Sequence, residues 1–172
     1  MDFQKLIINR ESIRDYDPDI KVDKEKISRI LEAGRLAPSA ANKQPWKFYL
    51  ISSVENLAKI RECYGRSWFK AAPHVLVVAG KKALAWTRQA DGYNSLETDL
   101  TIAMDHMILA AESEGIGTCW IAAFDPKALK NTGLFENDET VFAITPLGYQ
   151  NKGFTKSNSK NRKPFNEVVA FI

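Results

Sequence analysis

The sequence contains little cysteine and histidine, and it lacks the glycine-rich motifs that many nucleotide-binding proteins carry. Two cysteines and two histidines occur in 172 residues, with no CxxC pair and no HExxH motif. We therefore expect neither a disulfide framework nor a metal site. The absence of GxGxxG and GxxxxGKS/T motifs argues against a Rossmann dinucleotide site and against a P-loop.

Long apolar runs are also missing. The longest, at residues 75–79, has the length of a strand, far below the roughly 20 residues of a membrane-spanning helix. Residues 1–10 mix polar side chains into a helical pattern and show no apolar signal core. We expect no membrane partner and a cytoplasmic location. The net charge of +3 is too small and too evenly spread to predict nucleic-acid binding, but a local anion site would explain it.

Length and composition predict one globular domain with a C-terminal extension. Apolar residues make up 45% and charged residues 26%, which is ordinary for a globular protein of this size. We expect a domain at residues 1–150 and an extension at 151–172. Residues 151–163 carry five basic residues and no acid, which indicates a flexible basic tail. Residues 168–172 are mostly apolar and would form a strand that needs a sheet to join, on this subunit or another.

Apolar periodicity and turn residues predict interleaved helices and strands, and hence an α/β or α+β domain. Residues 81–94 show no clear period and are expected to be a loop with a possible helix. The predicted helices lie at residues 3–7, 23–36, 54–63, 95–115 and 126–130, and the predicted strands at 46–51, 75–78, 118–124 and 141–147.

The strongest helical pattern begins at Ser95, its expected N-cap, and ends at Gly115. Its apolar face comprises Leu96, Leu100, Ala103, Met104, Met107, Ile108 and Ala111. His106 is expected on the solvent side together with Asp99, as a surface histidine rather than a catalytic one. Cys119 lies in an apolar run and is expected to pack in the core rather than act as a nucleophile.

Three polar residues, Arg10, Ser12 and Arg14, alternate along a segment with no helical period. Alternate residues of an extended chain point the same way, so these side chains should converge on one face. Guanidinium groups bind phosphate through paired hydrogen bonds, which makes the pattern a candidate phosphate site. The alternative is a solvated edge whose arginines pair with Glu11 and Asp15.

Five segments of the sequence together resemble the flavin-dependent nitroreductase family. Residues 37–48 (APSAANKQPWKF) are similar to the family's signature loop, and the alternating segment at residues 10–14 to its phosphate and flavin-edge contact. Residues 115–124 (GIGTCWIAAF) resemble the turn and strand beneath the flavin ring. Residues 146–149 (PLGY) resemble the last strand of the domain, and residues 160–164 (KNRKP) the C-terminal phosphate clamp.

This resemblance implies an α+β fold, an α/β/α sandwich with a mostly antiparallel central sheet flanked by helices. It further implies a homodimer whose C-terminal strand is swapped between subunits, with FMN as cofactor and NADH or NADPH as transient electron donor. Arg10, Lys160 and Arg162 would hold the phosphate near Ser12, while Arg14 would stabilise the reduced flavin at its N1–C2 edge. Pro38, Ser39, Asn42 and Gln44 would reach the cofactor from the partner subunit, and Trp120, Ile121 and Ala123 would line the ring.

The expected function is transfer of electrons from NAD(P)H to a nitroaromatic, quinone or similar small-molecule acceptor by a ping-pong mechanism. No catalytic side chain is expected, because the flavin carries the chemistry. Residues 81–94 replace a longer helical insertion of larger members, which predicts an open substrate face, and Ala122 stands where some members have glutamate. Two alternatives remain: another flavin reaction, such as dehalogenation, flavin destruction or azoline dehydrogenation, and a non-enzymatic FMN-binding protein.

Overall fold

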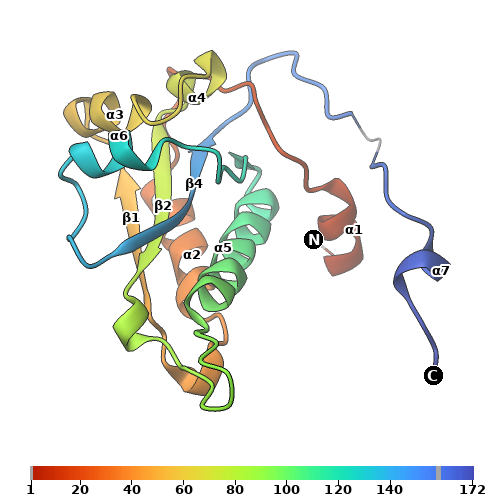
Figure 1. The fold of residues 1–172 in the computed structure, drawn as a ribbon. Helices are drawn as coiled ribbons and strands as arrows, with labels where there is room; N and C mark the ends of the chain where they lie inside the picture. The colour runs from red at the N-terminus through yellow and green to blue at the C-terminus, as the bar shows by residue number, and fades with distance from the viewer. Residues whose placement is uncertain (1, 158–159) are drawn as a thin grey trace.

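A four-stranded antiparallel sheet forms the centre of the molecule (Figure 1). The computed structural model describes residues 2–157 and 160–172. The sheet order is β1-β2-β4-β3, with β1 at Trp46–Ile51, β2 at His74–Gly80, β3 at Gly117–Thr118 and β4 at Thr140–Gly148. Every pair of neighbouring strands is antiparallel, as predicted.

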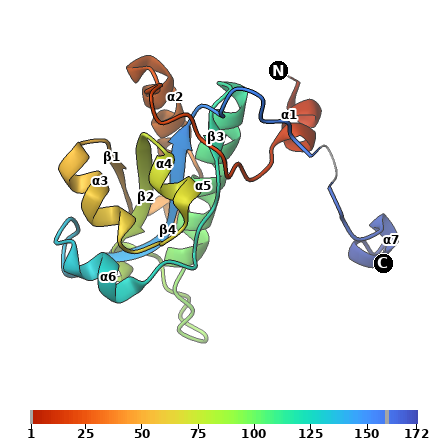
Figure 2. The ribbon, with the colours of Figure 1, turned by 90° about the horizontal axis from the view of Figure 1, so that it is seen from above.

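Helices cover both faces of this sheet and create two hydrophobic cores (Figure 2). Strand β2 is buried along its whole length, so its side chains alternate between the cores: Leu76 and Val78 enter one, Val75 and Val77 the other. The first core contains α2 (Lys24–Arg35) and α5 (Leu96–Ser113), and the second contains α3 (Val54–Arg61), α4 (Ser67–Ala71) and α6 (Pro126–Asn131). These three layers confirm the α/β/α sandwich.

The helix α5 buries the apolar face that its sequence predicts and ends at Ser113, two residues before Gly115, whose φ is +74°. Gly34 of α2 allows close packing, because a Cβ there would lie 2.7 Å from the Met107 side chain. The prediction for Asp99 is wrong, since its side chain is buried at 1% exposure. Its carboxylate tolerates burial because it accepts two hydrogen bonds, one of them from the Ser95 hydroxyl. His106 is half-buried.

Two further element predictions need correction. The strand expected at 118–124 ends at Thr118, because the Cys119 amide donates to the Thr145 hydroxyl rather than to a strand carbonyl. The chain rejoins the sheet only at Ile121, which pairs with Ile144. The helix α4 was not predicted.

Residues 85–94, which we call the finger, form a narrow hairpin within the segment where the sequence predicted a loop with a possible helix. The finger follows the short 3₁₀ helix η2 (Lys82–Leu84) and contains a bridge between Thr87 and Asn94. Its tip is closed by a bidentate ion pair of Arg88 with Asp91. The hairpin has no apolar period that would predict it, because backbone bonds such as Arg88 to Tyr93 and polar side-chain contacts hold it together.

The two chain ends leave the main body side by side (Figures 1 and 2). They carry α1 (Phe3–Asn9) and α7 (Phe165–Val168), and residues 149–157 and 160–172 form the described part of the C-terminal arm. The strand predicted at 168–172 is absent from the single chain: Val168 ends α7, and residues 169–172 pair with no described strand. Phe165 and Phe171 are 68% and 89% exposed. No helix in the described part of the chain has the length and apolarity needed to cross a membrane.

Candidate anion and cofactor site

The segment at residues 10–14 is extended and is held against β3. Ser12 forms a parallel bridge with Thr118, and the Ile13 amide donates to the Thr118 carbonyl at 2.8 Å. Ile13 is fully buried, so its neighbours Ser12 and Arg14 point to the opposite side. The alternation predicted from the sequence is therefore present in the structure.

The C-terminal arm returns to this segment and is fastened to it by polar contacts. The Lys156 ammonium bonds to the Glu112 carboxylate and donates to the Asn9 carbonyl. The Ser157 amide and hydroxyl both donate to Glu11, at 3.2 and 3.0 Å. Lys160 Nζ donates to the Ile7 carbonyl at 2.6 Å. Residues about 150 positions apart in the sequence thus become neighbours.

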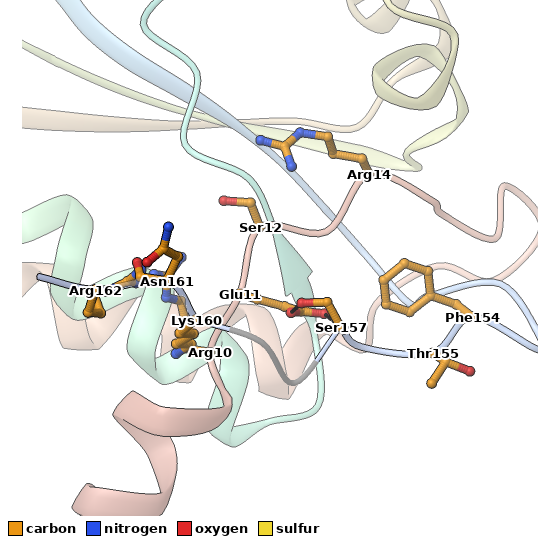
Figure 3. Close-up of a pocket in the computed structure, with 10 residues that line it drawn as sticks. All are labelled: Arg10, Glu11, Ser12, Arg14, Phe154, Thr155, Ser157, Lys160, Asn161 and Arg162. Atoms are coloured by element: carbon orange, nitrogen blue, oxygen red, sulfur yellow. Dashed lines mark hydrogen bonds between the residues drawn. The ribbon is translucent and has the colours of Figure 1, made fainter.

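A pocket of about 590 Å³ lies between the segment and the arm (Figure 3). In Figure 3, Arg10, Lys160, Asn161 and Arg162 gather on one side of the pocket, and Arg14 lies apart beyond Ser12. The residues that line the pocket are Arg10, Glu11, Ser12, Arg14, Phe154, Thr155, Ser157, Lys160, Asn161 and Arg162.

The pocket is strongly cationic. Within residues 2–157 and 160–172, no carboxylate forms an ion pair with Arg10, Arg14, Lys160 or Arg162. Burial and the charges of Arg10 and Arg162 hold the pKa of Lys160 below its usual value. Glu11 also lines the pocket and offsets part of this charge, but its carboxylate accepts from Ser157 and forms no ion pair with the four cations. Crowded cations without counter-ions are what an anion such as phosphate would stabilise.

The structure does not favour the alternative of a solvated edge. Glu11 bonds to Ser157, and Asp15 accepts from the Asn151 amide, so neither acid pairs with an arginine. The Arg14 guanidinium instead lies 6.0 Å from the centre of the Trp68 ring, a cation–π arrangement.

Cys119 lies close to this region without being a reactive group of the pocket. Its side chain is buried at 4% exposure, and burial raises the pKa of its thiol, although Arg14 and Arg10 oppose the rise. A buried thiol with a raised pKa is a poor nucleophile. The structure therefore supports the packing role expected from the sequence.

The loop at residues 39–44 lies elsewhere in the single chain, and none of its residues lines the pocket. It contains the short helix η1 (Ala40–Asn42), and three of its non-glycine residues, Ala41, Asn42 and Gln44, have φ values of +49°, +54° and +49°. Ser39 Oγ accepts from the Gln44 amide at 2.9 Å. Left-handed non-glycine residues are costly and gather at functional sites.

The remaining predicted residues are also outside the pocket. Pro38, before the loop, is exposed. Trp120 is half-buried and contacts Phe142 edge to face at 5.8 Å, and Ile121 is buried. Ala123 lines a different cavity, beside Tyr64.

One chain therefore brings together five of the predicted residues: Arg10, Ser12, Arg14, Lys160 and Arg162. Sequence reasoning missed the other five lining residues, among them Thr155, Ser157 and Asn161 of the arm. Their position among the basic residues of the arm could have predicted these arm residues, because a hydroxyl or amide there can share an anion with the basic side chains.

The fold and pocket define an α+β domain with a cationic pocket at one edge of its sheet, and comparison with known proteins identifies its family. The nitroreductase family model matches residues 7–65 and 55–149. A protein of Archaeoglobus fulgidus, provisionally named NADH dehydrogenase/NAD(P)H nitroreductase, is 33% identical over 84% of this chain and 83% of its own. The chain belongs to the nitroreductase family.

Solved structures show the same likeness over almost the whole chain. A nitroreductase family protein of Clostridium difficile 630 superposes with a TM-score of 0.90 at 30% identity, covering 99% of this chain and 98% of its own. An FMN-dependent nitroreductase of Clostridium difficile R20291 has a TM-score of 0.80 at 26% identity and covers 96% of both chains.

Proposed function

We propose that this protein is an FMN-dependent oxidoreductase that takes electrons from NAD(P)H and passes them to nitroaromatic, quinone or similar acceptors. The observation that carries the proposal is the cluster of Arg10, Lys160 and Arg162, which come from opposite ends of the chain and share one pocket. Relatives named NAD(P)H nitroreductase and FMN-dependent nitroreductase support it.

The residues present fit the phosphate end of FMN. Guanidinium groups from Arg10 and Arg162 offer paired donors, and the Ser12 hydroxyl can add another. An anion would also relieve the repulsion that lowers the pKa of Lys160. Arg14, at the other side of the pocket, would place a fixed positive charge where reduction of the ring builds negative charge.

Bound FMN would supply the redox chemistry itself, accepting a hydride from NAD(P)H and releasing electrons to the acceptor. The protein would hold and orient the cofactor and would set its electrostatic environment. With one open flavin face, donor and acceptor would take turns, which is a ping-pong mechanism.

The proposed assembly is a homodimer with exchanged C-terminal arms. The arm carries exposed apolar side chains, Phe165, Val168 and Phe171, that a partner would cover. Strand β1 is an edge of the sheet, whereas Ser12 pairs with the other edge at β3. Residues 168–172 could therefore add to β1 of a partner, and the partner's loop at 39–44 could complete the cofactor site.

Anaerobic spectroscopy tests the function. Purified protein should be yellow, NADH or NADPH should bleach its flavin absorption, and a nitroaromatic or a quinone should restore it. Bleaching without recovery would point to a different acceptor chemistry on the same fold. Bound FMN that neither nucleotide reduces would overturn the oxidoreductase proposal and leave an FMN-binding protein.

A further inference from the structure

We infer that Asp99 is a positioning residue that holds the 39–44 loop in its cofactor-binding shape. This inference rests on the proposed function, because it assigns to the loop a role at the flavin. Asp99 belongs to α5, lies outside the pocket, and was expected on the solvent side of its helix.

The carboxylate of Asp99 is one of the most deeply buried polar groups of the chain, at 1% exposure. Oδ1 accepts from the Ala40 amide at 2.8 Å, and Oδ2 accepts from the Ser95 hydroxyl at 2.8 Å. Both oxygens are thereby satisfied, and the first turn of an 18-residue helix favours negative charge at this position. The side chain has little freedom to point elsewhere.

The Ala40 contact lies where the loop needs support. Ala41, Asn42 and Gln44 adopt left-handed backbone conformations that L residues avoid, so the loop requires outside contacts to keep its shape. Within the loop, Ser39 and Gln44 bond to each other, but Ala40 bonds to Asp99 in the protein body. Asp99 is therefore the anchor between a strained loop and a rigid helix.

Asp99 also joins the loop to the finger. The Ser95 amide donates to the Trp86 carbonyl at 2.9 Å and closes the base of the finger, while its hydroxyl reaches Asp99. One carboxylate thus bonds both to the 39–44 loop and to the residue that closes the base of the finger.

The experiment removes either end of the Asp99–Ala40 bond. Asp99→Leu deletes the acceptor. Ala40→Pro deletes the donor and suits the site, because proline is accepted at the first position of a helix and Ser39 is already extended (φ −138°, ψ 156°). Asp99→Asn keeps an acceptor for Ala40 and can donate to Ser95. Leu100→Ala, a fully buried neighbour on α5, is the control for a loss of stability alone.

Two readouts separate positioning from general destabilisation. Amide hydrogen exchange of residues 40–44 in the FMN-free protein should rise in Asp99→Leu but not in Leu100→Ala. FMN affinity by fluorescence titration should fall about 10- to 100-fold in Asp99→Leu and Ala40→Pro, as for one lost charged hydrogen bond. The double variant should bind no more weakly than either single variant, because both remove the same bond. Asp99→Asn should stay within about threefold of wild type.

Riboflavin, which lacks the phosphate, shows which part of the cofactor is affected. Asp99→Leu should weaken riboflavin and FMN by the same factor, because the loop would contact the ring and side chain rather than the phosphate. Wild-type FMN affinity and wild-type exchange in both Asp99→Leu and Ala40→Pro would overturn the inference alone. A wild-type protein that binds no FMN would overturn the proposed function and, with it, the role of the loop.

Discussion

Removing a single arginine from the cationic pocket should weaken FMN binding by a predictable amount. We choose Arg10→Ala and Arg162→Ala because Lys160 also fastens the arm to the Ile7 carbonyl, so its loss would change the fold as well. Each arginine should contribute about 1.5–3 kcal/mol, the value of a charged hydrogen bond, or roughly 10- to 150-fold in affinity.

The structure places each effect toward the lower end of that range. Arg10 and Arg162 both lower the pKa of Lys160 through repulsion. Removing one of them relieves that repulsion, and Lys160 then takes over part of the phosphate contact. In each single variant Lys160 and the remaining arginine share the phosphate, so the double variant, which leaves Lys160 alone of the three, should lose more than the two single losses combined.

Equilibrium titration of flavin fluorescence measures these losses, with Lys163→Ala as the matched control outside the pocket lining. Riboflavin should bind Arg162→Ala and wild type alike, because it has no phosphate to lose. Unchanged FMN affinity in both arginine variants would refute the phosphate assignment. An equal loss of riboflavin would show that these arginines act on the shape of the pocket instead.

Three further predictions concern the C-terminal arm, the kinetic pattern and the buried His74. Truncation after Asn151 removes most of the arm and six of the ten residues that line the pocket, so the product should be colourless and should aggregate or fold poorly. Size-exclusion chromatography showing a soluble monomer that binds FMN tightly would contradict this. Double-reciprocal plots with NAD(P)H and acceptor varied should give parallel lines, and intersecting lines would reveal a ternary complex. Burial lowers the pKa of His74, whose Nε2 accepts from the Val22 amide. The free energy of unfolding, measured in urea, should therefore be full above about pH 6.5 and should fall below it by at most about 1.4 kcal/mol per pH unit. His74→Gln should flatten this part of the profile.

The elements set by local periodicity could be predicted from the sequence. Helix α5 shows its apolar face as a regular pattern, and β1 and β4 were located within a residue or so. The prediction failed where a side chain replaces a backbone partner. The Thr145 hydroxyl accepts from the Cys119 amide and so interrupts a strand. Asp99 can be buried because Ala40 and Ser95 donate hydrogen bonds to its carboxylate. Such partners are distant in sequence, so no local pattern contains them.

Local sequence patterns also predicted only part of the candidate site. Alternation in an extended segment was enough to predict that Ser12 and Arg14 share a face, and the structure confirms it. The spacing of residues in the sequence could not predict that Arg10 shares a pocket with Lys160 and Arg162, because about 150 residues separate them. That prediction came from the resemblance to a family. In the structure, contacts of Glu11, Lys156 and Lys160 hold the arm beside Arg10. The roles of the 39–44 loop and of residues 120–123 stay predictions.

The distribution of charge links these observations. The arm carries five basic residues between positions 151 and 163, more than the net charge of +3, so the rest of the chain is net negative. The positive charge is therefore concentrated in the segment that returns to Arg10 and closes the pocket. A surface that binds nucleic acid would spread such charge over an exposed face. Among the described residues, the basic arm folds back onto two arginines, and the cations of the pocket form no ion pair with a carboxylate, which is the charge arrangement of a site for one small anion.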